Sequence, residues 1–300
     1  MGTSLEYLVL GRLEVRRDGV TVPIGAPKQR ALLALLLLNA NENVSRERLI
    51  EELWGAQPPA TVSTALRVRV AELRRLLEPE RAAGTASDVI VSSDGRLCMN
   101  VEIEALDMLR FEALVGEAEE AAATRDHESA AELLRTALAL WRGPALEDFS
   151  YEPFAQPAIA RLEELRATAL ERRIDAELEL GRHERLVPEL DELITREPHR
   201  EHLRGQLMLA LYRSARQSDA LDAYQDARRQ LADVLGIEPS QELKELEQAI
   251  LRQDPELAQG RGDLTAPQER TKLRNPYKGL RPFDSADADD FFGRDTVVAE

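Results

Sequence analysis

Guanidinium groups gather in one short stretch of this 300-residue chain, ALRVRVAELRRLL at residues 65–77. On a helical wheel of about 100° per residue, one narrow sector is apolar and carries Leu66, Val70, Leu73 and Leu77. The other side holds Thr64, Arg67, Val68, Ala71, Arg74 and Arg75, with Arg69 at the border. Arginine can bond the O6 and N7 atoms of guanine and can neutralise phosphates. The stretch therefore predicts either a helix that enters a groove of DNA or an ordinary solvated face whose last arginines stabilise the helix dipole.

The charge of the chain is unevenly distributed. The formal net charge is −16, yet the first hundred residues carry 13 Lys and Arg against 12 Asp and Glu. Residues 101–260 carry 19 against 35. A polyanionic partner should therefore meet the first hundred residues and be repelled by the acidic middle.

The elements that would position the arginines can be read from turn and cap signals. Alternating apolar runs flank Asp18-Gly19 and again Asp94-Gly95, which predicts two hairpins. Pro27 suits the first turn of a helix over residues 28–39, and Ser45 suits the N-cap of a helix that Gly55 ends. Thr61 or Ser63 would cap a third helix running to Leu77. This order predicts a winged helix-turn-helix domain over residues 1–103.

The chain from residue 104 to 254 reads as helical throughout. Amphipathic segments are separated by glycine, proline or short polar turns. Two stretches echo one another when Gly181 is aligned with Ala215, a spacing of 34 residues that is the tetratricopeptide period. Small side chains fall where helices would approach closely, at Ala220, Ala223 and Ala227. We therefore expect a mainly α protein in which a small α+β part precedes a TPR-like, all-α repeat domain.

The last residues form two further segments. Residues 255–274 are polar and contain glycine and proline, which is typical of a linker. Residues 275–300 begin with the aromatic-containing NPYKGLRPF and read as the truncated start of another domain.

Several classes of chemistry find no support in the sequence. Cys98 is the only cysteine, which fits a reducing cytoplasm, and the longest apolar run, at 31–38, is far too short for a bilayer. The four histidines have no nearby set of further ligands, and none of the four lysines follows a glycine-rich phosphate loop. We expect no metal, no cofactor, no membrane contact and no enzymatic activity in these residues.

Residues 10–61 and ELRRLL at 72–77 resemble the Streptomyces antibiotic regulatory protein (SARP) family of the AfsR type, with its OmpR-like winged helix-turn-helix. ALALWRGPALEDF at 137–149 and RLEELRATALERRIDAELELGRH at 161–183 are similar to the bacterial transcriptional activation domain that follows it in this family. The resemblance covers residues 5–253. NPYKGLRPFDSADADDFFGRD at 275–295 resembles the start of a STAND-type NTPase domain, which large members carry next.

The resemblance implies a set of functional residues in a DNA-binding transcription activator, with secondary-metabolite genes among its expected targets. The helix from Ser63 to Leu77 would be the recognition helix. Bases and nearby phosphates would be contacted by Ser63, Thr64, Arg67, Val68 and Arg69, and the DNA backbone by Arg74 and Arg75. Further phosphate contacts would come from Lys28, Arg30, Ser45, Arg46 and, at the wing, Arg96. RNA polymerase would be met by the loop containing Gly55, Gln57, Pro58, Pro59 and Thr61.

The expected partners are double-stranded promoter DNA with direct repeats, RNA polymerase and a second copy of the chain. The sequence departs from the family pattern at Ala71-Glu72, Ser63-Thr64 and Gly95-Arg96, where Ser-Arg, Arg-Asn and Gly-Tyr are usual. Affinity or target sequence should differ accordingly. Two alternatives stay open at this stage, a helical-repeat interaction or signalling module of a larger STAND NTPase, and an NTP-driven signalling enzyme with its catalytic domain beyond Glu300.

Overall fold

The computed structural model describes residues 4–258, except 56 and 83. It opens with an antiparallel sheet of β1 (Leu5–Leu8), β2 (Glu14–Arg17) and β3 (Val20–Thr21), in that order. Asp18 and Gly19 both have positive φ angles, 48° and 78°, as the two central residues of a tight hairpin turn require. The first predicted hairpin is therefore confirmed.

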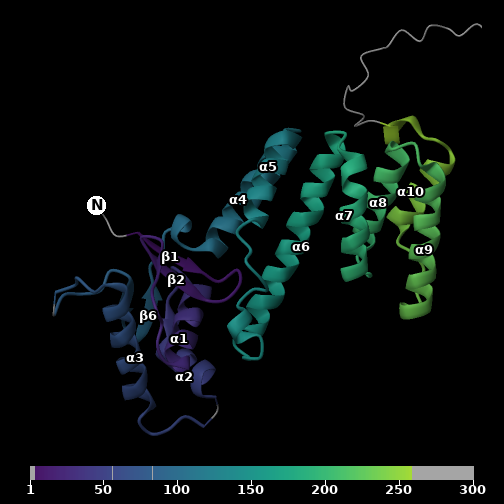
Figure 1. The fold of residues 1–300 in the computed structure, drawn as a ribbon. Coiled ribbons are helices and arrows are strands. Elements are labelled where there is room, and N and C mark those ends of the chain that lie inside the picture. Colours follow the sequence, from purple (N-terminus) through teal and green to yellow (C-terminus); the bar gives the residue numbers. More distant parts are fainter. Residues whose placement is uncertain (1–3, 56, 83, 259–300) are drawn as a thin grey trace, which may run out of the picture. The chain divides into compact units, whose positions relative to one another are not determined.

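Three helices follow, α1 (Pro27–Leu38), α2 (Arg46–Trp54) and α3 (Val62–Leu77) (Figure 1). Pro27 is the first residue of α1, and the Oγ atom of Ser45 caps α2 by accepting a 3.2 Å hydrogen bond from the Arg48 N–H. Gly55 ends α2 with a φ of 74°. Of the two predicted N-cap positions of α3, Thr61 is the one found, although its side chain makes no capping bond.

A second small sheet closes the N-terminal part, with the strand order β4 (Val44–Ser45), β6 (Arg96–Met99) and β5 (Ile90–Ser93). Asp94 and Gly95 form the turn of the predicted second hairpin, with φ angles of 46° and 77°. Ser45 pairs with Arg96 in the ladder between β4 and β6. This pairing ties the start of α2 to the tip of the hairpin, which is the wing.

The rest of the described chain is helical. Its elements are η1 (Ile103–Ala105), α4 (Asp107–Ala123), α5 (His127–Leu138), η2 (Glu147–Phe149), α6 (Gln156–Glu179), α7 (His183–Arg196), α8 (Glu201–Arg213), α9 (Gln217–Leu235), α10 (Gln241–Leu251) and η3 (Pro255–Ala258). Successive helices pack on one another, most extensively α4 with α5, α5 with α6, α7 with α8, and α8 with α9 (Figure 1). The predicted fold class is confirmed. No helix among the described residues is long and apolar enough to cross a membrane.

The predicted 34-residue echo corresponds to a repeated helix junction. Helices α7 and α9 begin at His183 and Gln217, and the residues two places earlier, Gly181 and Ala215, are left-handed with φ angles of 74° and 60°. The next N–H groups, of Arg182 and Arg216, each bond the carbonyl five residues back at 3.0 Å. This is the hydrogen bond of a Schellman ending, which turns the chain sharply from one helix into the next.

The hydrophobic core is divided inside α6. One cluster of buried side chains runs from Tyr7 to Ala169, and a second runs from Ile174 to Ile250. The first contains residues from both sides of position 103, so the N-terminal part and α4–α5 share one core. The proposed limits of the domains at 103 and 254 stay predictions. Residues 259–300, with most of the expected linker and the expected NTPase start, lie outside the described part.

A buried carboxylate joins the N-terminal part to α4. Asp107 is 5% exposed and accepts hydrogen bonds from the N–H groups of Val9 and Leu10 at 2.8 and 3.0 Å. Burial raises the pKa of Asp107 to about 6, against the opposing effect of these bonds and of Arg142, whose Nη2 lies 3.8 Å away. The junction between the two parts is thus hydrogen-bonded as well as apolar.

Candidate nucleic-acid interface

Helix α3 presents the faces that the wheel predicts. Leu66, Val70, Leu73 and Leu77 are all buried, which fixes the rotation of the helix. The outward side chains, Ser63, Thr64, Arg67, Val68, Ala71 and Arg75, are exposed. Val68 is 47% exposed, which makes it one of the few large apolar side chains left open to solvent. A valine in this position can contact the methyl group of thymine.

The arginines of α3 differ in what they contact. Arg67 makes only a 3.4 Å bond from Nε to the Ser63 carbonyl, and among the described residues no carboxylate lies within 4.0 Å of Arg67 or Arg75. Arg69 instead pairs with Glu72 at 2.8 Å, one turn away on the same helix. The carboxylate that departs from the family pattern thus neutralises Arg69. Arg67 and Arg75 remain available to an outside anion.

Arg74 holds the wing against α3. Its Nε and Nη2 atoms donate to the Ile90 carbonyl at 2.9 and 2.7 Å, and Nη2 also donates to the Ser92 Oγ at 2.7 Å. Burial is the main cause that lowers the pKa of Arg74, and the nearby cations Arg81 and Arg46 act in the same direction. Only Nη1 is left for an outside acceptor, so the predicted phosphate contact of Arg74 is at most partial.

The start of α2 and the wing lie together. Ser45 is paired with Arg96, and the N–H of Arg46 donates to the Gly95 carbonyl at 3.2 Å. Within the described chain, Arg46 and Arg96 have no carboxylate within 4.0 Å, and Arg46 is close enough to Arg74 to influence its pKa. The structure therefore brings Ser45, Arg46 and Arg96 to the side on which α3 meets the wing. The N-terminus of α2 adds a favourable partial charge for an anion there.

Lys28 and Arg30 do not join this group. Lys28 donates to the Leu53 carbonyl, at the end of α2 opposite to Ser45, and eight helical residues separate these ends by about 12 Å. Arg30 donates to the Leu13 carbonyl at 3.0 Å and pairs with Asp148 of η2. Both arise from α1, whose start packs against α2 and the helical part. The two side chains therefore lie apart from the group on α3 and the wing, and their contacts with phosphates stay a prediction.

The expected polymerase loop is exposed. Gly55 has a φ of 74°, and Gln57, Pro58, Pro59 and Thr61 are all open to solvent, while Ala56 lies outside the described residues. The N–H of Val62 donates to the Pro59 carbonyl at 2.9 Å, which joins the loop to the first turn of α3.

The sequence analysis missed two residues that contribute to this candidate interface. Arg48, in the first turn of α2, is exposed and has no carboxylate within 4.0 Å among the described residues, and its place after the Ser45 cap could have revealed it. Arg17 of β2 donates to the Leu76 and Leu77 carbonyls at 2.6 and 3.3 Å and so fixes the end of α3. No sequence signal marks Arg17, because its partners lie about sixty residues away in the chain.

Metal chemistry finds no site in the described part of the chain. No three His, Cys, Asp or Glu side chains there are grouped as metal ligands would be. His202, one of the histidines considered for such a role, bonds Asp175 instead, with 3.0 Å between Nε2 and Oδ2.

Comparison with known proteins agrees with this geometry. Residues 23–96 match the family described as Transcriptional regulatory protein, C terminal, and residues 106–251 match the Bacterial transcriptional activator domain. Regulatory protein AfsR of Streptomyces coelicolor is 42% identical over 99% of this chain, and the match spans only 28% of that relative. Regulatory protein DnrI of Streptomyces peucetius is 39% identical over 84% of this chain and 93% of its own length.

A solved structure shows the same fold. Mycobacterium tuberculosis EmbR, in a structure described as a complex with a low affinity phosphopeptide, superposes with a TM-score of 0.80 at 36% identity. The alignment covers 87% of this chain and 69% of that one. With both family matches and DnrI, 93% of whose length is matched, in agreement, the chain belongs to the SARP family of transcriptional regulators, of the AfsR type.

Proposed function

We propose that this chain is a sequence-specific DNA-binding transcriptional activator. One observation carries the proposal. Five arginines without a carboxylate partner among the described residues lie on α3, at the start of α2 and on the wing, namely Arg67, Arg75, Arg46, Arg48 and Arg96, of which only Arg46 is half-buried. Most arginines of the helical part are ion-paired instead, for example Arg161 with Glu112 at 2.7 Å. Unpaired guanidinium groups on one side are what a phosphate backbone requires.

In this proposal α3 lies in the major groove. Arg67 reads a guanine, Val68 contacts a thymine methyl group, and Arg75 contacts a phosphate. Arg46 and Arg96 contact the DNA backbone beside the wing. Arg74 fixes the position of the wing relative to α3 through its hydrogen bonds to β5. The function requires no catalytic group, and none of these residues is assigned one.

The remaining partners are proposed on the resemblance to the family. Two copies of the chain would occupy a direct repeat, and the exposed loop from Gly55 to Thr61 would contact RNA polymerase. The protein would act in the cytoplasm. The winged helix-turn-helix at 1–103 would bind DNA, and the helical repeats at 104–254 would mediate contacts between proteins. The expected STAND-type start at 275–300 belongs to this proposal too.

The test is selection of bound fragments from random DNA pools, followed by shift assays on the selected site over a range of salt. We expect one enriched sequence whose affinity falls steeply with salt, because each neutralised phosphate contributes about 0.9 to the slope. The double variant Arg46→Ala, Arg96→Ala should lose about two units of slope. The matched control is Arg185→Ala, Arg252→Ala, which removes two exposed arginines of the helical part that have no carboxylate partner among the described residues. No enrichment, with weak and salt-independent binding, would favour the interaction-module alternative.

A further inference from the structure

A small cavity of about 260 Å³ lies between α6, α8 and α10, outside the proposed DNA interface. Its apolar wall consists of the leucines Leu178, Leu209, Leu243 and Leu246. Its polar wall includes the carboxylates of Asp175, Glu201 and Glu242, and no lysine or arginine lines it. The cavity is smaller than the 300–1,000 Å³ typical of sites for drug-sized ligands. It therefore suits a short aliphatic molecule with a positive end.

Gln206, which lines the same cavity, has a buried acceptor atom without a donor within the described chain. Gln206 is 3% exposed, and its Nε2 donates to the Glu171 carbonyl at 2.7 Å and to the Asp175 Oδ1 at 2.6 Å. These two acceptors fix the orientation of the amide, because its oxygen could not donate to them. Among the described residues no donor reaches Gln206 Oε1. A buried carbonyl oxygen that lacks a donor is costly, and a ligand N–H group would remove that cost.

The glycine of α8 preserves the volume of the cavity. Gly205 lies in the middle of the helix, where glycine is unfavourable, and it lines the cavity. A Cβ atom added there would meet Leu243 Cδ1 and Leu246 Cδ2 at 3.7 Å, which is ordinary contact. Packing alone therefore does not demand glycine at this position. A larger side chain would fill the space.

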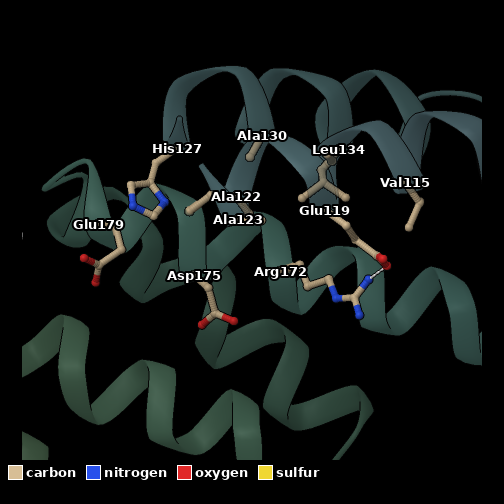
Figure 2. A pocket seen from close by; sticks show the side chains of 12 residues that line it. Val115, Glu119, Ala122, Ala123, His127, Ala130, Leu134, Arg172, Asp175 and Glu179 are labelled. Atoms are coloured by element: carbon tan, nitrogen blue, oxygen red, sulfur yellow. Dashed lines mark hydrogen bonds and ion pairs between the residues drawn. The ribbon is translucent and has the colours of Figure 1, made fainter. Parts of the chain in front are cut away.

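The neighbouring larger cavity makes a useful contrast. It measures about 440 Å³, lies between α4, α5 and α6, and shares Asp175 with the first (Figure 2). Its other carboxylates already have arginine partners, since Glu119 pairs with Arg172 and Glu179 pairs with Arg213 at 3.1 Å. In the smaller cavity, by contrast, Glu242 has no cation within 4.0 Å among the described residues. A carboxylate without a cationic partner, the exposed Glu242, thus lines the smaller cavity.

The other two carboxylates of the cavity, of Asp175 and Glu201, have no lysine or arginine partner in the described part of the chain either. Asp175 bonds the His202 Nε2, and this bond is the main cause that raises the pKa of His202. Glu201 accepts only a backbone bond, from the N–H of Ser240 at 2.7 Å. The described lining of the cavity therefore contains three carboxylates, and its only basic side chain is the imidazole of His202.

We propose that this cavity binds a small free alkylamine or alkylguanidine. The cationic head donates to Gln206 Oε1 and lies near Asp175 and Glu242, while the alkyl chain packs on the four leucines. Because the ligand contacts α6, α8 and α10 together, it stabilises the packing of these helices. The proposal does not depend on DNA binding, so its outcome is separate from that of the proposed function.

The first test is calorimetric titration of the whole chain with n-pentylamine, supported by the shift in melting temperature. The neutral analogue 1-pentanol and the anionic analogue pentanoate serve as ligand controls. We expect saturable binding of one pentylammonium ion per chain, binding of pentanol at least tenfold weaker, and no binding of pentanoate. Equal binding of amine and alcohol would overturn the proposal, because it would show that only the apolar wall matters. Binding of a capped lysine tripeptide in preference to the free amine would also overturn it, since the site would then belong to a protein partner.

Substitutions of lining residues test whether the ligand binds in this cavity. Glu242→Gln should weaken pentylammonium binding at least fivefold, and its control Glu245→Gln, on the same helix but outside the lining, should not. Gly205→Leu should abolish binding by filling the cavity, and circular dichroism verifies that the variant is folded. Should that variant fail to fold, Gly205→Ala, whose Cβ fits without displacement, should still weaken binding. Unchanged affinity in both Glu242→Gln and the folded glycine variant would refute the site.

Discussion

The four arginine side chains of α3 have three different surroundings within little more than two helical turns. Arg67 and Arg75 are exposed without a carboxylate partner among the described residues, Arg69 is paired with Glu72, and Arg74 is bonded to β5. An ion pair on the surface is worth little and can be exchanged for a phosphate, whereas the bonds of Arg74 to a carbonyl would leave that carbonyl unsatisfied if broken. We therefore expect these four residues to respond differently to mutation.

Arg67→Ala should change sequence preference. Loss of a bidentate contact to guanine removes about 1–3 kcal/mol of discrimination at one base pair. Binding to the selected site should weaken, while binding to random DNA should change little. Competition shift assays on the selected site and on versions substituted at each position measure this. Equal weakening on all sequences would show that Arg67 contacts the backbone instead.

Arg75→Ala should act on every sequence alike. It removes one cation from the phosphate side of α3, so the slope of log affinity against log salt should become shallower by about 0.9. The measurement is the slope for the variant and for the natural chain, on the selected site and on random DNA, and both kinds of DNA should show the same change. Arg30→Ala is the comparison, because Arg30 is occupied by Asp148 and Leu13, and its slope should equal that of the natural chain. A shallower slope for Arg30→Ala would instead show that α1 contacts the DNA backbone.

The sequence predicts the exposed face of α3 but not what its side chains touch. Periodicity identifies Leu66, Val70, Leu73 and Leu77 as the buried sector because burial follows the 3.6-residue repeat. The Arg69–Glu72 pair is visible too, as an i, i+3 spacing. The bonds of Arg74 to Ile90 and Ser92, and of Lys28 to Leu53, depend on tertiary packing and leave no local signal. For this reason the sequence does not show that Lys28 and Arg30 lie apart from Arg46 and Arg96, and the DNA contacts of all four residues stay predictions.

At the scale of elements, the turns and caps were predicted well because they depend on local chemistry. Both Asp-Gly hairpins, the Ser45 cap and the Gly55 ending lie where the sequence places them. The division of the hydrophobic core inside α6, by contrast, could not be predicted from local sequence signals. Which neighbour covers each part of α6 is decided by residues far away in the chain.

Asp107, which joins β1 to the start of α4, predicts a pH dependence. Its pKa of about 6 in the folded chain lies above its ordinary value of 3.8, so the folded state holds the proton more firmly between these values. The contribution of Asp107 to the free energy of unfolding should therefore fall as pH rises from about 4 to about 6, by up to about 3 kcal/mol, and stay constant above.

Asp107→Asn removes this titration and supplies the reference. The difference in unfolding free energy between the natural chain and the variant, from urea denaturation at several pH values, should decline across that window. A difference that is the same at pH 4 and pH 7 would mean that the carboxylate stays ionised, held by the N–H groups of Val9 and Leu10.

The Schellman junctions predict a stabilising change. Ala215 adopts a left-handed φ of 60° where the other repeat has Gly181. A left-handed conformation costs a residue with a Cβ atom roughly 1–2 kcal/mol, part of which is offset by the greater freedom of glycine in the unfolded chain. Ala215→Gly should therefore raise the free energy of unfolding by about 0.5–1 kcal/mol in urea titrations. The control Gly181→Ala should lower it, and a loss of stability in Ala215→Gly would show that the Ala215 side chain makes a packing contribution of its own.

For the whole described chain, two large cores linked by α6, with a small cluster of Ala130, Ala131 and Ala176 between α5 and α6, predict two units of local unfolding. Leu162 and Ala169 belong to one core and Ile174 and Leu178 to the other, and no buried side chain is shared. Polar bonds supplement the packing of α8 and its flanking loop on α6, among them Arg200 to Glu171 at 2.9 Å and Gln206 to the Glu171 carbonyl at 2.7 Å. Such bonds add less cooperativity than shared apolar packing would, because water can replace them when the helices separate.

Two cavity-creating variants test this. Leu190→Ala and Leu36→Ala each remove a fully buried leucine, at a cost of about 2–5 kcal/mol to the core that contains it. Native-state hydrogen exchange should then show faster exchange along α7–α10 in the first variant, with α1–α3 unchanged, and the reverse in the second. Faster exchange over all helices in both variants would mean that α6 transmits the loss and that the described chain unfolds as one unit. In that case a ligand bound between α6, α8 and α10 would stabilise the winged part as well, since free energy gained in one core would be shared by the other.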